Sequence, residues 1–61
     1  MTLENLIAAL EAFAEVSIRT TFHDDVLFEG IAVGNKSQWV EYAQRRVNLI
    51  KHRNGVYVIY V

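Results

Sequence analysis

The sequence contains one group of residues that could bind a metal ion. His23, Asp24 and Asp25 are consecutive, Glu29 follows shortly after them, and His52 could join them in the folded chain. Imidazole and carboxylate groups are common ligands of divalent metal ions. The spacing matches no established ligand motif, however, and consecutive side chains point in divergent directions. We therefore expect a polar turn, in which aspartate side chains accept hydrogen bonds from backbone N–H groups, and neither a metal nor another cofactor.

Residues suited to nucleophilic catalysis are few. The chain has no cysteine, and neither Ser17 nor Ser37 has a histidine beside it in the sequence, although a serine nucleophile needs a base within hydrogen-bond reach. Glu29 could be a partly buried carboxylate, but one carboxyl group does not supply a reaction. A domain of this length also rarely encloses a substrate pocket. The sequence therefore predicts a protein that is not an enzyme.

Four basic residues lie close together near the C-terminus: Arg45, Arg46, Lys51 and Arg53. Arginine and lysine neutralise phosphates, and nearby tyrosines can stack on bases. In an extended strand, however, Lys51 and Arg53 point to the opposite face from His52. Charges at the tip of a hairpin also commonly protect a sheet edge from aggregation. Nucleic-acid binding through the segment 45–53 is therefore the alternative function rather than the first.

The charges are divided between the two halves of the chain. Residues 1–34 carry six acids and one base, whereas residues 35–61 carry five bases and one acid, for a net charge of −1. Such a division is compatible with a basic half that contacts nucleic acid. It is equally compatible with acidic and basic surfaces that neutralise each other within the fold or between copies. The balanced total favours the second interpretation.

The last sixteen residues predict a β-hairpin. Asn54-Gly55 lies between two runs rich in Val, Ile, Leu and Tyr, and this dipeptide is the strongest short signal for a two-residue turn. The turn would pair Arg53 with Val56 and Leu49 with Tyr60. Side chains then alternate between two faces, and both are apolar. One face carries Ile50, Tyr57, Ile59 and Val61, and the other carries Val47, Leu49, Val56, Val58 and Tyr60.

The remaining elements precede this hairpin. Residues 2–14 read as an amphipathic helix with an apolar stripe from Leu3 to Phe13 and Thr2 as its N-cap. Residues 16–22 and 26–33 read as two strands joined by a polar turn, and Gly30 indicates a bulge, a bend or a close backbone approach. A short helix from Ser37 to about Arg45 would follow. One long helix from 37 to 52 is the competing interpretation of the same spacing.

These elements predict a single small α+β domain spanning residues 1–61. The N-terminal helix would pack on a four-stranded antiparallel sheet made of two hairpins joined by a short helix, in the order α-β-β-α-β-β. A chain of 61 residues without cysteine has a small core and no disulfide to support it. Oligomerisation is the remaining way to bury more apolar surface.

The sequence also indicates the compartment. The N-terminus lacks the basic region of a signal peptide, and glutamates interrupt its apolar runs. No run approaches the length of a membrane span. We therefore expect a cytoplasmic protein without membrane contact.

Several short stretches resemble a known group of sequences. They are Val16-x-Ile18, Leu27-Phe28-Glu29-Gly30-x-Ala32, Arg46-Val47 and the terminal Val56-x-Val-Ile-x-Val61. Together they span residues 16–61 and resemble short orphan proteins encoded by bacteriophages and integrated mobile elements, most of which have no assigned function. The resemblance implies a fold and a genomic setting rather than an activity. It makes a host or phage protein a reasonable partner.

Protein–protein contact is the function that the sequence favours. Trp39 and Tyr42 flank the short helix, and both residue types are common at interfaces, although Trp39 could instead close one end of the core. One helix cannot cover both faces of a four-stranded sheet, so a second copy of the chain would cover the other face. We therefore expect a homodimer whose interface includes Trp39, Tyr42, Val56, Val58 and Tyr60.

Overall fold

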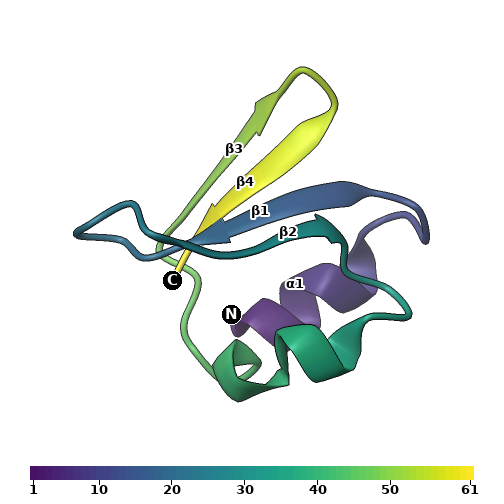
Figure 1. The fold of residues 1–61 in the computed structure, drawn as a ribbon, viewed down its shortest axis with the longest axis horizontal. Helices are drawn as coiled ribbons and strands as arrows, with labels where there is room; N and C mark the ends of the chain where they lie inside the picture. The colour runs from purple at the N-terminus through teal and green to yellow at the C-terminus, as the bar shows by residue number, and fades with distance from the viewer.

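The computed structural model describes residues 1–61 and contains one α-helix, four strands and two short 3₁₀ helices (Figure 1). The helix and the four-stranded sheet confirm the predicted α+β class. The elements are α1 (Leu3–Ala9), β1 (Glu15–Arg19), β2 (Val26–Ile31), η1 (Lys36–Gln38), η2 (Val40–Tyr42), β3 (Leu49–Arg53) and β4 (Val56–Tyr60).

The sheet is mixed, so the prediction of a purely antiparallel sheet was wrong. The strand order is β2-β1-β4-β3, and the two central strands β1 and β4 are parallel. The cause lies in the connection 32–48, which runs beneath the sheet and returns to the end where β2 began (Figure 1). Strand β3 therefore runs in the direction of β2, and β4 runs in the direction of β1. Such a crossover is what a parallel pair requires.

Both predicted hairpins are present. Strands β1 and β2 are antiparallel, with a register shift between Ile18 and Arg19. In the second hairpin Arg53 pairs with Val56 and Leu49 pairs with Tyr60, which confirms the predicted register. Asn54 and Gly55 have φ angles of 52° and 79°, as a turn with two left-handed residues requires.

Helix α1 is shorter than predicted. The Thr2 hydroxyl accepts a hydrogen bond of 3.2 Å from the N–H of Asn5, which caps the helix start. The helix ends at Ala9, and the chain then turns toward β1. Phe13, which was expected to belong to the apolar stripe, therefore lies outside the helix and is 84% exposed.

The predicted helix between the hairpins is replaced by the two 3₁₀ helices, and the long helix from 37 to 52 is absent. Trp39 separates η1 from η2 with φ −128° and ψ 4°, which is not a helical conformation. Trp39 and Ala43 both reach the core, whereas Val40 is exposed. The chain remains irregular until β3 begins at Leu49, and Val47 packs against the core instead of continuing the strand.

The core lies between α1, the segment 32–43 and one face of the sheet. Every covering element lies on that side of the sheet (Figure 1). The central strands contribute Val16, Ile18 and Ile59, which are almost completely buried. The full set of buried apolar residues is Leu3, Leu6, Ile7, Val16, Ile18, Phe28, Ala32, Trp39, Ala43 and Ile59.

Candidate interaction surface

The second face of the sheet has no helix or loop packed over it, and we call it the open face. Alternation along the strands defines its members, because Val16 and Ile18 point to the core and their neighbours point away. The residues of the open face are Val26, Glu29 and Ile31 on β2; Glu15, Ser17 and Arg19 on β1; Val56, Val58 and Tyr60 on β4; and Leu49, Lys51 and Arg53 on β3.

The strand register arranges these side chains in rows across the sheet. Ile31, Glu15, Val56 and Arg53 form the first row. Glu29, Ser17, Val58 and Lys51 form the second. In both rows a valine on β4 separates an acidic residue on β1 or β2 from a basic residue on β3. In these two rows the open face thus has an acidic side, an apolar centre and a basic side.

The third row joins Val26, Arg19, Tyr60 and Leu49. Tyr60 continues the apolar centre beyond the two valines, and Leu49 is about half exposed. The side chain of Lys51 lies over the Tyr60 ring, with Nζ 5.5 Å from the ring centroid. An ammonium group at this distance is attracted by the electron-rich ring face.

A polar network occupies the acidic side of the open face. The Arg19 guanidinium donates from Nε to the Ser17 hydroxyl at 3.0 Å and pairs with Asp24 at 3.2 Å and Glu29 at 3.6 Å. Ser17 in turn donates to Glu29 at 3.1 Å. These bonds satisfy the Ser17 hydroxyl, although that residue is only 3% exposed. Asp24 and Glu29, considered above as metal ligands, are thus held by an arginine.

The two histidines considered with them lie elsewhere. His52 stacks on Tyr57 across the second hairpin, with ring centroids 4.4 Å apart, and both point away from the open face. His23 and Asp25 are exposed in the turn between β1 and β2. The structure brings no three histidine, aspartate or glutamate side chains into a metal-binding group.

The four basic residues proposed for nucleic-acid contact are divided into two pairs. Lys51 and Arg53 lie on the open face. Arg45 and Arg46 precede β3, where the Arg45 guanidinium lies 5.1 Å from the centroid of the Tyr42 ring. Arg46 pairs with Thr2 through an isolated backbone bridge at the start of α1. The two pairs therefore belong to different parts of the fold.

The five residues predicted for a protein interface are divided as well. Val56, Val58 and Tyr60 lie side by side along β4 on the open face. Trp39 is 3% exposed and belongs to the core. Tyr42 lies on η2, on the side of the molecule opposite the open face. A side-chain hydrogen bond with Glu41, together with partial burial and the Glu41 charge, raises the pKa of Tyr42, while the charge of Arg45 acts against this rise.

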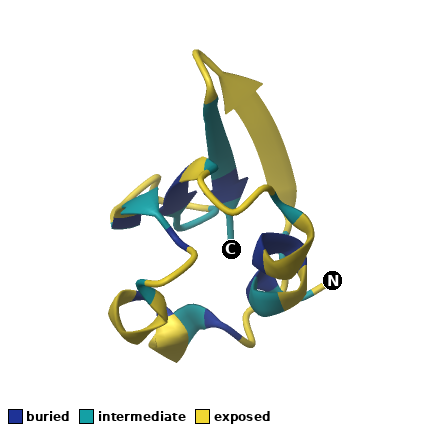
Figure 2. Cartoon of the chain, turned by 90° about the vertical axis from the view of Figure 1, so that its right-hand side faces the viewer, coloured by how far each residue is buried: buried dark blue, intermediate teal, exposed yellow.

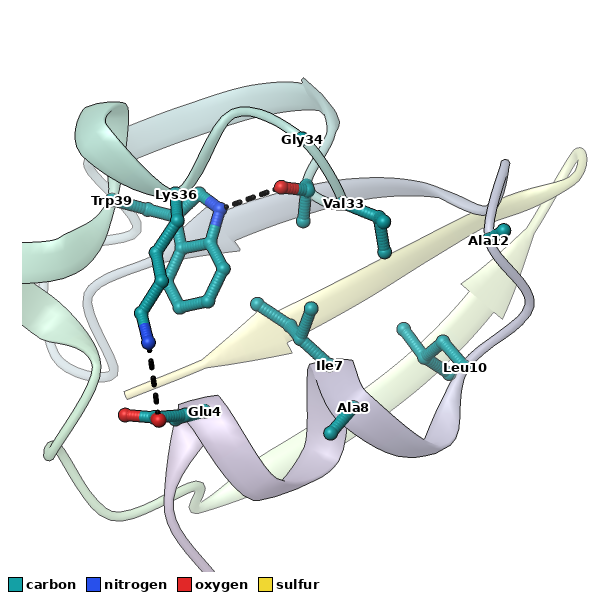
Figure 3. A pocket seen from close by; sticks show the side chains of 10 residues that line it. Glu4, Ile7, Ala8, Leu10, Ala12, Val33, Gly34, Lys36 and Trp39 are labelled. Atoms are coloured by element: carbon teal, nitrogen blue, oxygen red, sulfur yellow. Dashed lines mark hydrogen bonds and ion pairs between the residues drawn. The ribbon is translucent and has the colours of Figure 1, made fainter.

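A groove of about 450 Å³, which the sequence did not indicate, lies between α1 and the segment 32–39 (Figure 3). Its walls are mainly apolar and include Ile7, Leu10 and Trp39. At one end Lys36 pairs with Glu4 at 3.1 Å. The residue in the sequence that could have indicated this groove is Gly34, whose φ of 89° turns the chain back toward α1.

The edge of the sheet beside the open face is also unprotected. All five residues of β3 are exposed, and no strand pairs with its outer edge (Figure 2). The charged side chains of Lys51 and Arg53 lie along it, which disfavours uncontrolled pairing with other sheets.

Comparison with known proteins identifies no relative. No protein-family model matches the chain, and no curated protein or solved structure matches it either. No helix of the chain is long and apolar enough to cross a bilayer.

Proposed function

We propose that this protein is a non-enzymatic protein–protein interaction module that self-associates through the open face. The observation that carries the proposal is the one-sided cover of the sheet. Val56, Val58 and Tyr60 form an apolar row on β4, and no helix or loop packs over them. Covering these three side chains would bury more apolar surface in a chain that buries only 11 of its 61 residues.

The open face supplies both parts of an interface. Its centre is apolar and its two sides are charged, which matches the apolar core and polar rim of protein–protein contacts. The face is small, however, because the sheet has four strands of five or six residues. We therefore expect a weak dimer rather than an obligate one. The resemblance to phage-encoded proteins adds a host or phage protein in the cytoplasm as a further partner within this proposal.

The solution mass tests the proposal. Sedimentation equilibrium at protein concentrations up to about 1 mM, where even weak dimers are populated, should show a reversible monomer–dimer equilibrium. Val58→Lys places a charge in the apolar centre and should give a monomer. Val40→Lys is the matched control, since Val40 is an exposed valine away from the sheet, and it should behave like the unchanged chain. An unchanged chain that stays monomeric throughout would end the proposal.

A second candidate function is binding of RNA or DNA. The observation in its favour is that Lys51 and Arg53 share the open face with Tyr60, so phosphate-binding and base-stacking groups lie together. Titration with mixed-sequence single strands distinguishes the two functions. Affinity for nucleic acid should fall steeply between low and moderate salt, whereas apolar self-association should change little. Arg45→Ala with Arg46→Ala, and Lys51→Ala with Arg53→Ala, would separate the contributions of the two basic pairs.

A further inference from the structure

The three ion pairs of the chain leave several charges of the open face without partners. Arg19 pairs with Asp24 and Glu29, and Lys36 pairs with Glu4. Glu15, Lys51 and Arg53 take part in none of them. All three are exposed, and Glu15 and Arg53 lie in the same row on either side of Val56. The single chain thus presents separate acidic and basic positions on one face.

We infer that two copies pack face to face about a two-fold axis parallel to β4, so that Arg53 of each copy meets Glu15 of the other. This inference rests on the proposed self-association and names its geometry. Two packed sheets keep their strands roughly aligned and stand about 10 Å apart. A two-fold axis between the faces can then run along the strands or across them.

The charge arrangement distinguishes these two axes. An axis along β4 places the valines and Tyr60 of one copy over those of the other. It exchanges the two sides of the sheet and keeps each row in register, so β3 of one copy lies over β1 of the other. Arg53 then lies over Glu15, and Lys51 lies over Ser17, beside Glu29. Each apolar centre is covered, Arg53 meets an acidic residue, and Lys51 lies near a second one.

An axis across the strands gives the opposite result. Each strand then lies over its own copy, with its direction reversed about the middle row. Lys51 would face Lys51 and Glu29 would face Glu29, which places like charges against each other at the interface. Glu15 would face Arg19, but that arginine already pairs with Asp24 and Glu29 within its own chain. Like-charge contacts suppress an arrangement even where apolar contact favours it. The distribution of charge therefore selects the axis along β4, and the pair Glu15–Arg53 specifies it.

Charge exchange at these two positions tests the geometry. Glu15→Arg creates two arginine–arginine contacts in the dimer, and Arg53→Glu creates two glutamate–glutamate contacts. Each single variant should dimerise about tenfold more weakly than the unchanged chain at low salt. An equimolar mixture of the two should form a heterodimer in preference to either homodimer. The double variant, Glu15→Arg with Arg53→Glu, should recover the original affinity because both contacts become attractive again.

A control pair carries the same charge changes away from the open face. Glu11→Arg and Arg46→Glu alter exposed residues outside the sheet, and their mixture should show no preference for the heterodimer. NMR titration of an isotope-labelled variant with an unlabelled one gives each affinity and confirms that both chains are folded. If the unchanged chain dimerises but the open-face pair shows neither heterodimer preference nor recovery in the double variant, the geometry is wrong while the proposed function stands. A monomeric unchanged chain would overturn both.

Discussion

The indole N–H of Trp39 donates a hydrogen bond of 3.0 Å to the backbone carbonyl oxygen of Ala32. This bond joins the 3₁₀ segment to the residue that follows β2 and fixes the ring within the core. The Ala32 carbonyl also accepts from the N–H of Asn35, at 3.0 Å. Ala32 and Trp39 therefore anchor both ends of the turn that carries the chain beneath the sheet.

Trp39→Phe should destabilise the protein by about 1–3 kcal/mol, because it removes this hydrogen bond and part of a buried ring. Urea unfolding followed by circular dichroism measures the loss. Gln38→Ala is the control, since Gln38 is exposed on η1 and its side chain donates only one long bond of 3.4 Å. An unchanged midpoint for Trp39→Phe would contradict the anchoring role of the indole.

Gly55 supports a second prediction through its backbone alone. Its φ of 79° lies in the left-handed region, and no atom lies within 4 Å of the position that a Cβ would occupy. Gly55→Ala should therefore cost about 1 kcal/mol from backbone strain without steric overlap. Asn54→Gly, which also preserves a positive φ, should change the free energy of unfolding by much less. An equal loss of unfolding free energy in the two variants would show that the positive φ of Gly55 does not determine the stability of the turn.

The second hairpin was predictable because its determinants are local. Asn54-Gly55 selects the turn, and a two-residue turn leaves one register for Leu49–Tyr60 and the pairs between them. The open face follows from that register, so Val56, Val58 and Tyr60 could be grouped from the sequence.

The order of the strands depends on contacts between distant residues, which no local pattern reports. The parallel pairing of β1 with β4 follows from the path of residues 32–48 beneath the sheet. Backbone hydrogen bonds join this segment to the start of α1. The backbone N–H of Glu4 donates to the Ala43 carbonyl at 2.9 Å, and the backbone N–H of Val47 donates to the Met1 carbonyl at 2.9 Å. The same contacts displace the helix that the spacing of Trp39 and Ala43 suggested, because the chain must stay extended enough to cross beneath the sheet.

Tyr42 supports a prediction about pH. Its pKa is raised chiefly by the hydrogen bond with Glu41, further by partial burial and the Glu41 charge, and lowered by Arg45. Glu41→Gln should therefore lower the pKa of Tyr42, and Arg45→Ala should raise it. Because the raised pKa favours the neutral phenol in the folded state, any stability that Tyr42 contributes is lost as the pH rises through that pKa. NMR titration of the Tyr42 ring measures the shift, with Glu11→Gln as a control that should leave it unchanged.

The three phenylalanines give the sharpest test of the fold, because they occupy opposite environments. Phe28 is 8% exposed in the core, whereas Phe13 and Phe22 are 84% and 92% exposed. Sequence periodicity placed Phe13 on the apolar stripe of the helix and Phe22 at the end of the strand expected over residues 16–22. The structure instead puts Phe13 in the turn after α1 and Phe22 in the turn after β1. Replacing each phenylalanine by alanine therefore tests the burial seen in the structure against the burial that sequence periodicity predicts.

Phe28→Ala should cost about 3–5 kcal/mol, because it removes a buried ring and leaves a cavity. Phe13→Ala and Phe22→Ala should each lie within about 0.5 kcal/mol of the unchanged chain, as exposed positions do. The Phe22 turn keeps its shape through the backbone, since Thr20 and Asp25 are joined by a 2.9 Å bond and Thr21 donates to Val61 at 3.0 Å. Thermal unfolding of the three variants at low protein concentration measures the intrinsic losses. A loss at Phe13 or Phe22 comparable to that at Phe28 would mean that the ring is buried and that the helix or the first hairpin extends as periodicity predicts.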